Sequence, residues 1–196
     1  MANLFAIHSV LNSLTTFLRN SYPDELRNRF DCSFRLLSSG ELETITDAET
    51  TLSLYLHRVT LNEHMRNQQR TNGNLQGRTI LSLDLHFLLS VWTTSVLAEH
   101  TLMSWAMRQI HLHPALNAST LSPDAAWDAH DIVQIAPAEL SNEELVRIWD
   151  RLKPSYRLST PYLARVVRIA PDDVDDALPV VSTRFSYAAT ETGDRS

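Results

Sequence analysis

Glycine, cysteine and lysine are all scarce in this chain, and each shortage excludes a class of protein. Its 196 residues include 4 glycines and 1 cysteine. The sequence has no glycine loop for phosphate, no Walker lysine and no Gly-x-Ser-x-Gly turn, so the common nucleotide-binding and serine-hydrolase patterns are absent. The single cysteine, Cys32, excludes an intrachain disulfide and a thiolate zinc knuckle.

Long apolar runs and basic stretches are also missing. No run approaches the ~20 apolar residues that a membrane-spanning helix needs. The first residues lack the basic flank and the long apolar block of a signal peptide. The formal net charge of −6 gives no electrostatic reason to hold nucleic acid or an anionic membrane. We therefore expect a soluble protein made in the cytosol, without nucleic acid or membrane among its partners.

The remaining composition fits one globular domain. The chain is 43% hydrophobic and 20% charged, and it is long enough for one proper core and short for two. Lys153 is the only lysine, so 16 of the 17 basic residues are arginine. Arginine is enriched at protein interfaces, although the codon bias of a GC-rich genome explains the same excess.

Apolar residues at steps of three and four predict the helices. The first covers residues 3–21, and its stripe is Leu4, Ile7, Leu11, Leu14 and Leu18. A second covers residues 95–111. Ser141 and Glu144 form a capping box for a third helix, and the Ser122–Pro123 pair predicts a short helix that runs through Trp127.

Alternating apolar residues predict the strands, at residues 32–38, 51–62, 80–92, 131–136 and 161–169. Between Leu56 and Val59 the apolar positions change phase, which indicates a bulge or burial on both faces. Strands 51–62 and 80–92 are joined by a polar stretch, so they are expected to form a long antiparallel hairpin. The acidic residues 40–50 are expected to form a solvated loop.

The C-terminal segment differs from the rest of the chain. Four aspartates between residues 172 and 176 interrupt the pattern, and residues 178–187 are then β-prone but isolated. A segment of this kind often adds to the edge of another sheet. Together the patterns predict an α/β fold: a mixed, largely antiparallel sheet with helices packed on one face. The expected domain covers residues 1–170, and residues 171–196 form an acidic linker and an extended C-terminal arm.

Three histidines are the residues to consider first as ligands of a metal site. His100, His111 and His113 are candidate zinc ligands, which leaves a small histidine-dependent metal hydrolase as an alternative. However, the last two lie at a helix end, where cationic side chains also favour the helix dipole. No Glu-x-x-His pair accompanies them. We therefore expect no metal, no cofactor and no catalytic residues.

Other reactive residue types have simpler explanations. Ser82, Asp84 and His86 are alternate residues of one strand, so their side chains run parallel and cannot converge as a triad. Cys32 is expected to be a half-buried strand residue. The tryptophans are too dispersed for a base-stacking platform and are expected to anchor the core or an interface; they are Trp92, Trp105, Trp127 and Trp149.

Several segments in series resemble one family. They include MANLFAIHSVLNSL, LSLYLHRVTLNEHMRN, LSLDLHFLLSVW, AEHTLMSWAMRQIHLHP and PVVSTRFSY. On these segments the chain resembles the cap, or tail-terminator, proteins of extracellular contractile injection systems. Those are the phage-tail-like particles of the Photorhabdus virulence cassette and antifeeding prophage type. The resemblance covers nearly all of residues 1–187.

The resemblance implies a structural protein similar to phage tail terminators. Such proteins form a hexameric ring on the end of the inner tube and sheath that is distal to the baseplate. They stop polymerisation and anchor the last sheath ring. Implied partners are further copies of the chain and the tube and sheath subunits. The resemblance implies a particle that is assembled in the cytoplasm, and both later release from the cell and retention agree with it. The alternative within this class is a baseplate or tube-adaptor subunit.

Exposure arguments, rather than matched family positions, select the candidate contact residues. In the arm, the candidates for contact with a neighbouring cap subunit or the last sheath subunit are Val180, Val181, Arg184, Phe185 and Tyr187. At the hairpin tip, the candidates for contact with tube subunits are Arg66, Arg70 and Arg78.

Overall fold

The computed structural model describes residues 2–62, 80–152 and 156–170. The elements in these ranges are α1 (Ala6–Asn20), α2 (Asp24–Arg29), β1 (Ser33–Leu37), α3 (Ser39–Leu42), β2 (Thr51–Leu61), β3 (Leu81–Trp92), α5 (Val96–Leu112), β4 (Ala115–Asn117), the 3-10 helix η1 (Pro123–Ala125), β5 (Ile132–Pro137), α6 (Asn142–Arg151) and β6 (Ser159–Ile169). The described strands form one six-stranded sheet, ordered β1-β2-β3-β6-β5-β4. Only β1 and β2 pair in parallel. The predicted α/β class, with a mixed and largely antiparallel sheet, is confirmed.

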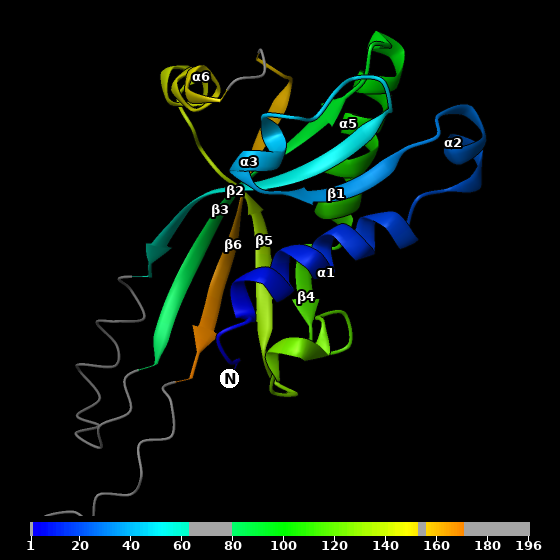
Figure 1. Cartoon of the computed structure of the whole chain (residues 1–196). Coiled ribbons are helices and arrows are strands. Elements are labelled where there is room, and N and C mark those ends of the chain that lie inside the picture. The colour runs from blue at the N-terminus through cyan, green and yellow to red at the C-terminus, as the bar shows by residue number, and fades with distance from the viewer. Residues whose placement is uncertain (1, 63–79, 153–155, 171–196) are drawn as a thin grey trace, which may run out of the picture.

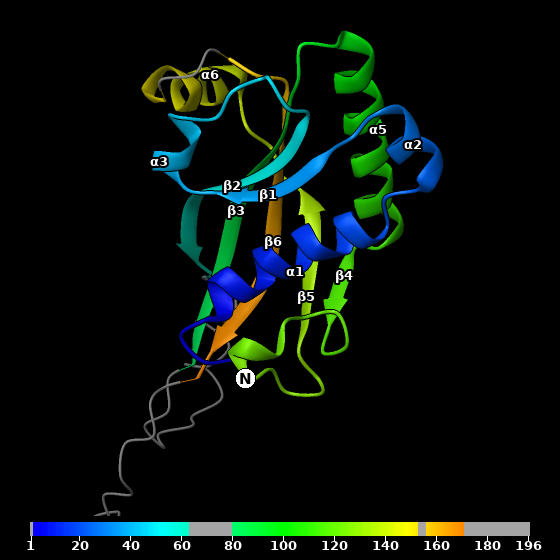
Figure 2. The same ribbon diagram turned by 45° about the vertical axis from the view of Figure 1, so that its right-hand side comes forward.

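The main core lies between one face of the sheet and the helices α1 and α5 (Figures 1 and 2). Phe87 and Leu89 of β3 belong to this core, together with Leu14 of α1 and Leu102 of α5. These residues are the apolar positions that the strand and helix periods predicted. The packing of α1 and α5 on this face agrees with the expected helical layer.

A smaller cluster on the opposite face of the sheet was not anticipated. Leu88 and Trp92 of β3 meet Leu42 of α3 and Trp149 of α6 there. The second half of β3 is apolar at successive positions, from Phe87 to Leu89, so it presents apolar side chains to both faces. Helices therefore cover this half of the sheet on both sides.

Helix α1 begins later than its apolar spacing predicted. It starts at Ala6, so Leu4 precedes the helix and is 76% exposed instead of lying on the core stripe. Two buried serines on α1 hold the segment around η1. Trp127 Nε1 donates to Ser9 Oγ over 2.9 Å, and the backbone N–H of Ser122 donates to Ser13 Oγ over 2.7 Å.

The short elements were the least predictable. The segment expected as an acidic loop begins with α3, whose capping box joins Ser38 and Glu41. The helix expected through Trp127 is only the 3-10 turn Pro123–Ala125. The capping box of Ser141 and Glu144 starts α6, as predicted.

Candidate assembly surface

Three segments of the described chain meet at one end of the sheet. Leu61, at the end of β2, pairs with Leu83, and Leu81 pairs with Ile169 at the end of β6. The N-terminus joins them, because Ala2 bridges Ile169 and accepts a 2.8 Å hydrogen bond from the backbone N–H of Ala170. Figure 1 shows the N-terminus near the lower ends of β3 and β6.

The candidate contact residues from the sequence lie outside the described residues. These are Arg66, Arg70 and Arg78 of the hairpin tip, and Val180, Val181, Arg184, Phe185 and Tyr187 of the arm. The chain leaves β2 after Asn62, and it leaves β6 after Ala170. Both candidate segments are therefore attached at the same end of the sheet.

A β-bulge keeps the apolar residues of β2 on one face. The register shifts between Leu56 and Arg58, which identifies His57 as the extra residue. Beyond it, Val59 pairs with Leu85 and Leu61 with Leu83. Both partners belong to the main core, and paired residues share a face. Of the two explanations for the phase change, the structure selects the bulge.

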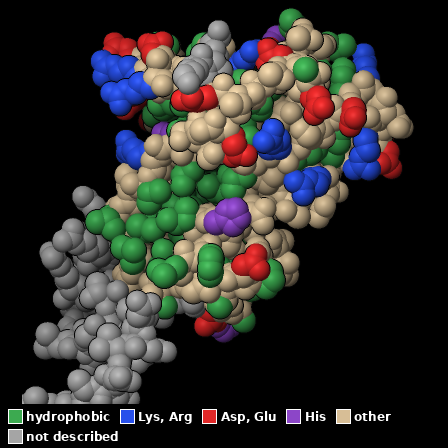
Figure 3. Space-filling model, in the orientation of Figure 1, with side chains coloured by type: hydrophobic (Ala, Val, Ile, Leu, Met, Phe, Trp, Pro, Cys, Tyr) green, Lys and Arg blue, Asp and Glu red, His purple; other side chains and the backbone are tan. Residues whose placement is uncertain are grey.

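Exposed apolar side chains collect beside this end of the sheet. Phe5 is 63% exposed, and Leu61 is 53% exposed. We define the apolar patch as the exposed Leu4, Phe5, Val59, Leu61 and Leu81 together with the partly buried Leu56. In Figure 3 a broad hydrophobic area covers the region where α1 begins and the lower ends of β2 and β3 lie. Contiguous exposed apolar surface of this kind marks an interaction site.

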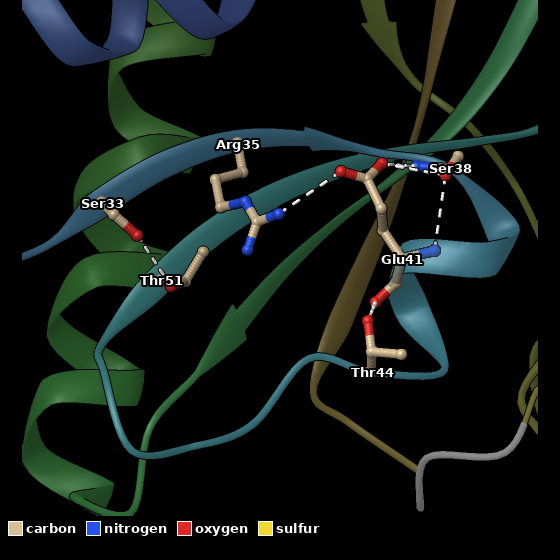
Figure 4. Close-up of polar contacts among 6 residues, drawn as sticks. All are labelled: Ser33, Arg35, Ser38, Glu41, Thr44 and Thr51. Atoms are coloured by element: carbon tan, nitrogen blue, oxygen red, sulfur yellow. Dashed lines mark hydrogen bonds and ion pairs between the residues drawn. The ribbon is translucent and has the colours of Figure 1, made fainter.

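A groove of about 550 Å³ adjoins the apolar patch. Its walls include the start of α1 (Leu4, Phe5, Ile7), the end of β1 (Leu36, Leu37) and Leu56 of β2. The turn after β1 is fixed by polar contacts (Figure 4). Ser38 Oγ accepts from the backbone N–H of Glu41, and Arg35 Nη2 donates to the Glu41 carboxylate over 3.3 Å.

Strand β2 has a free edge next to this groove. Strand β1 pairs with Thr51 to Tyr55 only. From Leu56 to Leu61, β2 pairs with β3 on one side, and no described strand pairs with it on the other. A free edge bordered by exposed apolar side chains is a template for a further strand.

The opposite face of the β2–β3 hairpin is polar. Thr60 Oγ1 lies 3.0 Å from His86 Nε2, and Asn62 Nδ2 donates to both carboxylate oxygens of Asp84 over 3.0 and 3.1 Å. His86 and Asp84 thus have separate partners on β2 or just after it. They do not form a triad with Ser82, which agrees with the prediction made from the alternate positions of the three residues on one strand.

Two histidines lie close together beside the bulge. The rings of His57 and His86 have centroids 6.2 Å apart. Burial lowers the pKa of His57 to about 4, and the neighbouring His86 and Arg58 act in the same direction. Burial also lowers the pKa of His86, as does the Arg58 guanidinium. Both imidazoles are therefore neutral at pH 7.

The candidate zinc ligands are not brought together. His100 lies in α5, His111 near its end and His113 just after it. His111 lies eleven positions after His100 in the helix, which corresponds to about 16 Å along the axis. Among the described residues, no group of three metal-ligating side chains gathers in one place.

The tryptophans lie where the sequence predicted, and Cys32 is partly buried as expected but precedes the strand instead of belonging to it. Cys32 lies just before β1 and is partly buried, and burial raises the pKa of its thiol to about 12. Such a thiol is a poor nucleophile. Trp92, Trp105 and Trp149 are buried, and Trp127 packs against the main core.

Comparison with solved structures identifies two proteins with a similar fold. One is the cryo-EM structure of the PVC sheath/tube terminator of an extracellular contractile injection system in its extended state, with a TM-score of 0.55 and 18% identity over 96% of this chain. The other is the cryo-EM structure of the anti-feeding prophage cap, an AFP tube terminating cap, with a TM-score of 0.57 and 15% identity over 91% of this chain. The matches span 65% and 60% of those two chains.

Sequence comparison places the chain in a family. No curated protein matches it in sequence. In the described residues, no helix has both the length and the apolar character to span a membrane. A model of the Pvc16 N-terminal domain matches residues 9–183. Because this match covers most of its length, the chain belongs to the Pvc16 N-terminal domain family.

Proposed function

We propose that this chain is a structural cap that ends polymerisation of the tube and sheath of a contractile injection system. The observation that carries the proposal is the fold: most of the chain superposes on a sheath/tube terminator and on a tube-terminating cap. The apolar patch and the free edge of β2 suit a protein whose work is contact with other subunits. In this role the chain transforms no substrate.

The proposed assembly is a closed hexameric ring of identical subunits. Such a ring needs a heterologous interface that closes after six steps. A 196-residue globule has a radius of gyration of about 16 Å, and as a sphere it is about 40 Å across. Six spheres in a ring enclose a hole of about 40 Å, before any loop enters it. Mass photometry of the purified chain tests the stoichiometry directly.

Tube and sheath subunits are the proposed partners, in a phage-tail-like particle assembled in the cytoplasm. The hairpin tip with Arg66, Arg70 and Arg78 is the proposed tube contact. The arm, residues 178–187, is proposed to contact a neighbouring cap subunit or the last sheath subunit. Both segments are attached at the end of the sheet that carries the apolar patch.

Loss of the gene in the producing cell tests the cap role. Particles without a cap should have tubes and sheaths of uncontrolled length, as seen by electron microscopy. Particles of normal length and integrity would contradict the proposal. Labelled chain should appear at the end distal to the baseplate. Label at the baseplate end would favour the alternative of a baseplate or tube-adaptor subunit.

Charge reversal tests the hairpin tip. Replacing Arg66, Arg70 and Arg78 by Glu should weaken binding to tube protein, because the three contact charges change sign. The matched control reverses three exposed arginines on other elements, Arg29, Arg108 and Arg151. Equal loss of tube binding in both variants would refute a specific role for the tip.

A further inference from the structure

The free edge of β2 and the apolar patch form one continuous docking surface. The edge runs from Leu56 to Leu61, and the patch residues Val59 and Leu61 lie on the core-facing side of that strand. A strand added to this edge would place alternate side chains over the patch. Suitable strands therefore have apolar residues at every second position and polar residues between them.

Within the arm, residues 181–187 of the same chain have this pattern, whereas Leu178 and Val180 before them are apolar at the intervening positions. Val181, Phe185 and Tyr187 fall at alternate positions, with Thr183 between them. The intervening positions are polar: Ser182, Arg184 and Ser186. One face of such a strand is apolar and the other is polar, which matches the apolar patch on one face of the β2–β3 hairpin and the polar residues on the other.

The positions of the chain ends favour an occupant from a second copy. Ala170 follows β6, and β6 is separated from the free edge of β2 by β3. The free edge lies two strand spacings from β6, about 10 Å. To reach its own free edge, the arm would have to cross the connection from Asn62 to Ile80, and connections rarely cross at the same end of a sheet. A linker of seven residues, such as 171–177, can span at most about 23 Å, which is enough to enter a subunit in contact.

We propose that residues 178–187 of one copy add as a strand to the free edge of β2 in a neighbouring copy. Val181, Phe185 and Tyr187 then cover the apolar patch. The contact is heterologous, since one subunit donates the strand and the next accepts it, so repetition around an axis closes a ring. The inference rests on the proposed function in one respect, the closure of a ring. On this geometry Val181, and not Val180, faces the patch.

Single-cysteine variants test this contact in the full-length chain. In a Cys32→Ser background, a chain with Val59→Cys is mixed with an isotopically heavy chain that carries Thr183→Cys, which lies on the patch-facing side of the arm without being one of its anchors, and thiols are joined by oxidation or by a short bis-maleimide. The matched control replaces Val59→Cys by Ser104→Cys, at an exposed position on α5. Docking should give at least about fivefold more heavy-light dimer than the control, because it raises the local thiol concentration.

Competition supplies a second measurement on the same proteins. An added peptide of residues 176–190 should reduce the yield of the heavy-light dimer. The same peptide with Phe185→Ser and Tyr187→Ser should not reduce it, because it lacks the two aromatic anchors. Equal competition by both peptides would overturn the proposed anchors.

Two results would show that the arm of a second copy does not occupy the free edge of β2. A link within one chain of the Val59→Cys/Thr183→Cys double variant, with no link between chains, would place the arm on its own sheet. Yields equal to the Ser104→Cys control would show that the arm docks elsewhere, for example on sheath. If either result is found while loss of the gene still gives particles of uncontrolled length, the cap function is supported and only the proposed strand contact is rejected.

Discussion

The indole rings of Trp92 and Trp149 meet edge to face, with their centroids 5.8 Å apart, and this contact fastens α6 to the sheet. Trp149 is the only buried residue of α6. Trp92 is itself fixed, because its Nε1 donates to Ser53 Oγ over 2.8 Å. Trp149 is therefore the most deeply buried contact of α6, and the partly buried Leu145 and Ile148 pack against the same cluster.

Replacing Trp149→Ala should release α6. The substitution removes a buried aromatic ring, and the expected loss is about 3–5 kcal/mol in the free energy of unfolding. Hydrogen exchange should rise over residues 142–151 and stay unchanged in α1, which packs on the other face. The control Val146→Ala, at an exposed position of the same helix, should cost less than about 0.5 kcal/mol. Protection of α6 in the Trp149→Ala variant would contradict this role.

Acid should destabilise the fold through His57. Its pKa of about 4 in the folded chain is below the ordinary value of 6.5. At a pH between these two pKa values, the unfolded chain therefore binds more protons than the folded chain. The stability that neutral His57 contributes is complete above pH 6.5 and is lost as the pH falls towards 4. Its size is at most about 2 kcal/mol, since partial exposure screens the charge.

Denaturant titrations at pH 7.5, 5.5 and 4.5 measure this effect. The His57→Gln variant should lose less stability than the parent chain over this range, because glutamine does not titrate. A His130→Gln variant, changed at an exposed histidine, serves as the control. Equal slopes in the parent chain and the His57→Gln variant would contradict the prediction.

Cys32 should react slowly with thiol reagents. Burial raises the pKa of its thiol from 9.0 to about 12, so the thiolate fraction at pH 8 is about 1000-fold lower than in an ordinary thiol. We expect reaction with a disulfide reagent to be at least ~100-fold slower in the folded chain than in denaturant. Comparable rates in both conditions would show that the thiol is not shielded.

Polar substitutions in the apolar patch should spare the fold and weaken self-association. Phe5→Ser with Leu61→Ser removes two side chains that are 63% and 53% exposed, so the fold should lose only about 0.5–1 kcal/mol. The control Val96→Ser with Leu97→Ser changes a similarly exposed pair on α5. Sedimentation should show fewer rings only for the first variant. Intact rings in that variant would exclude the patch from the subunit interface.

The sequence predicted the long elements well because their periods are strong. The alternation of β3 and the apolar stripe of α1 each persist over many residues, and the Ser141–Glu144 capping box located α6. The equivalent box of Ser38 and Glu41 went unrecognised because α3 has only 4 residues and leaves no period to detect. Strand β4, with 3 residues, was missed for the same reason.

Tertiary features were harder to predict. Nothing local to β1 reveals that it pairs in parallel with β2, since that pairing depends on how the chain returns through α3. The apolar phase change near Leu56 did signal a bulge, but its consequence, an apolar patch beside a free edge, needed the register with β3. Leu4 belongs to this patch although its spacing continued the core stripe of α1. The arm and hairpin-tip residues lie outside the described residues and stay predictions.

The bridge between Ala2 and Ile169 has a practical consequence for engineering this protein. It ties the N-terminus to the end of the sheet where the chain also leaves β6, so a reporter fused before Ala2 would be tethered beside the apolar patch. Helix α2 lies away from that end (Figure 2) and has no buried residue. A fluorescent label attached to an exposed side chain of α2 should leave docking undisturbed, because the helix is remote from the apolar patch.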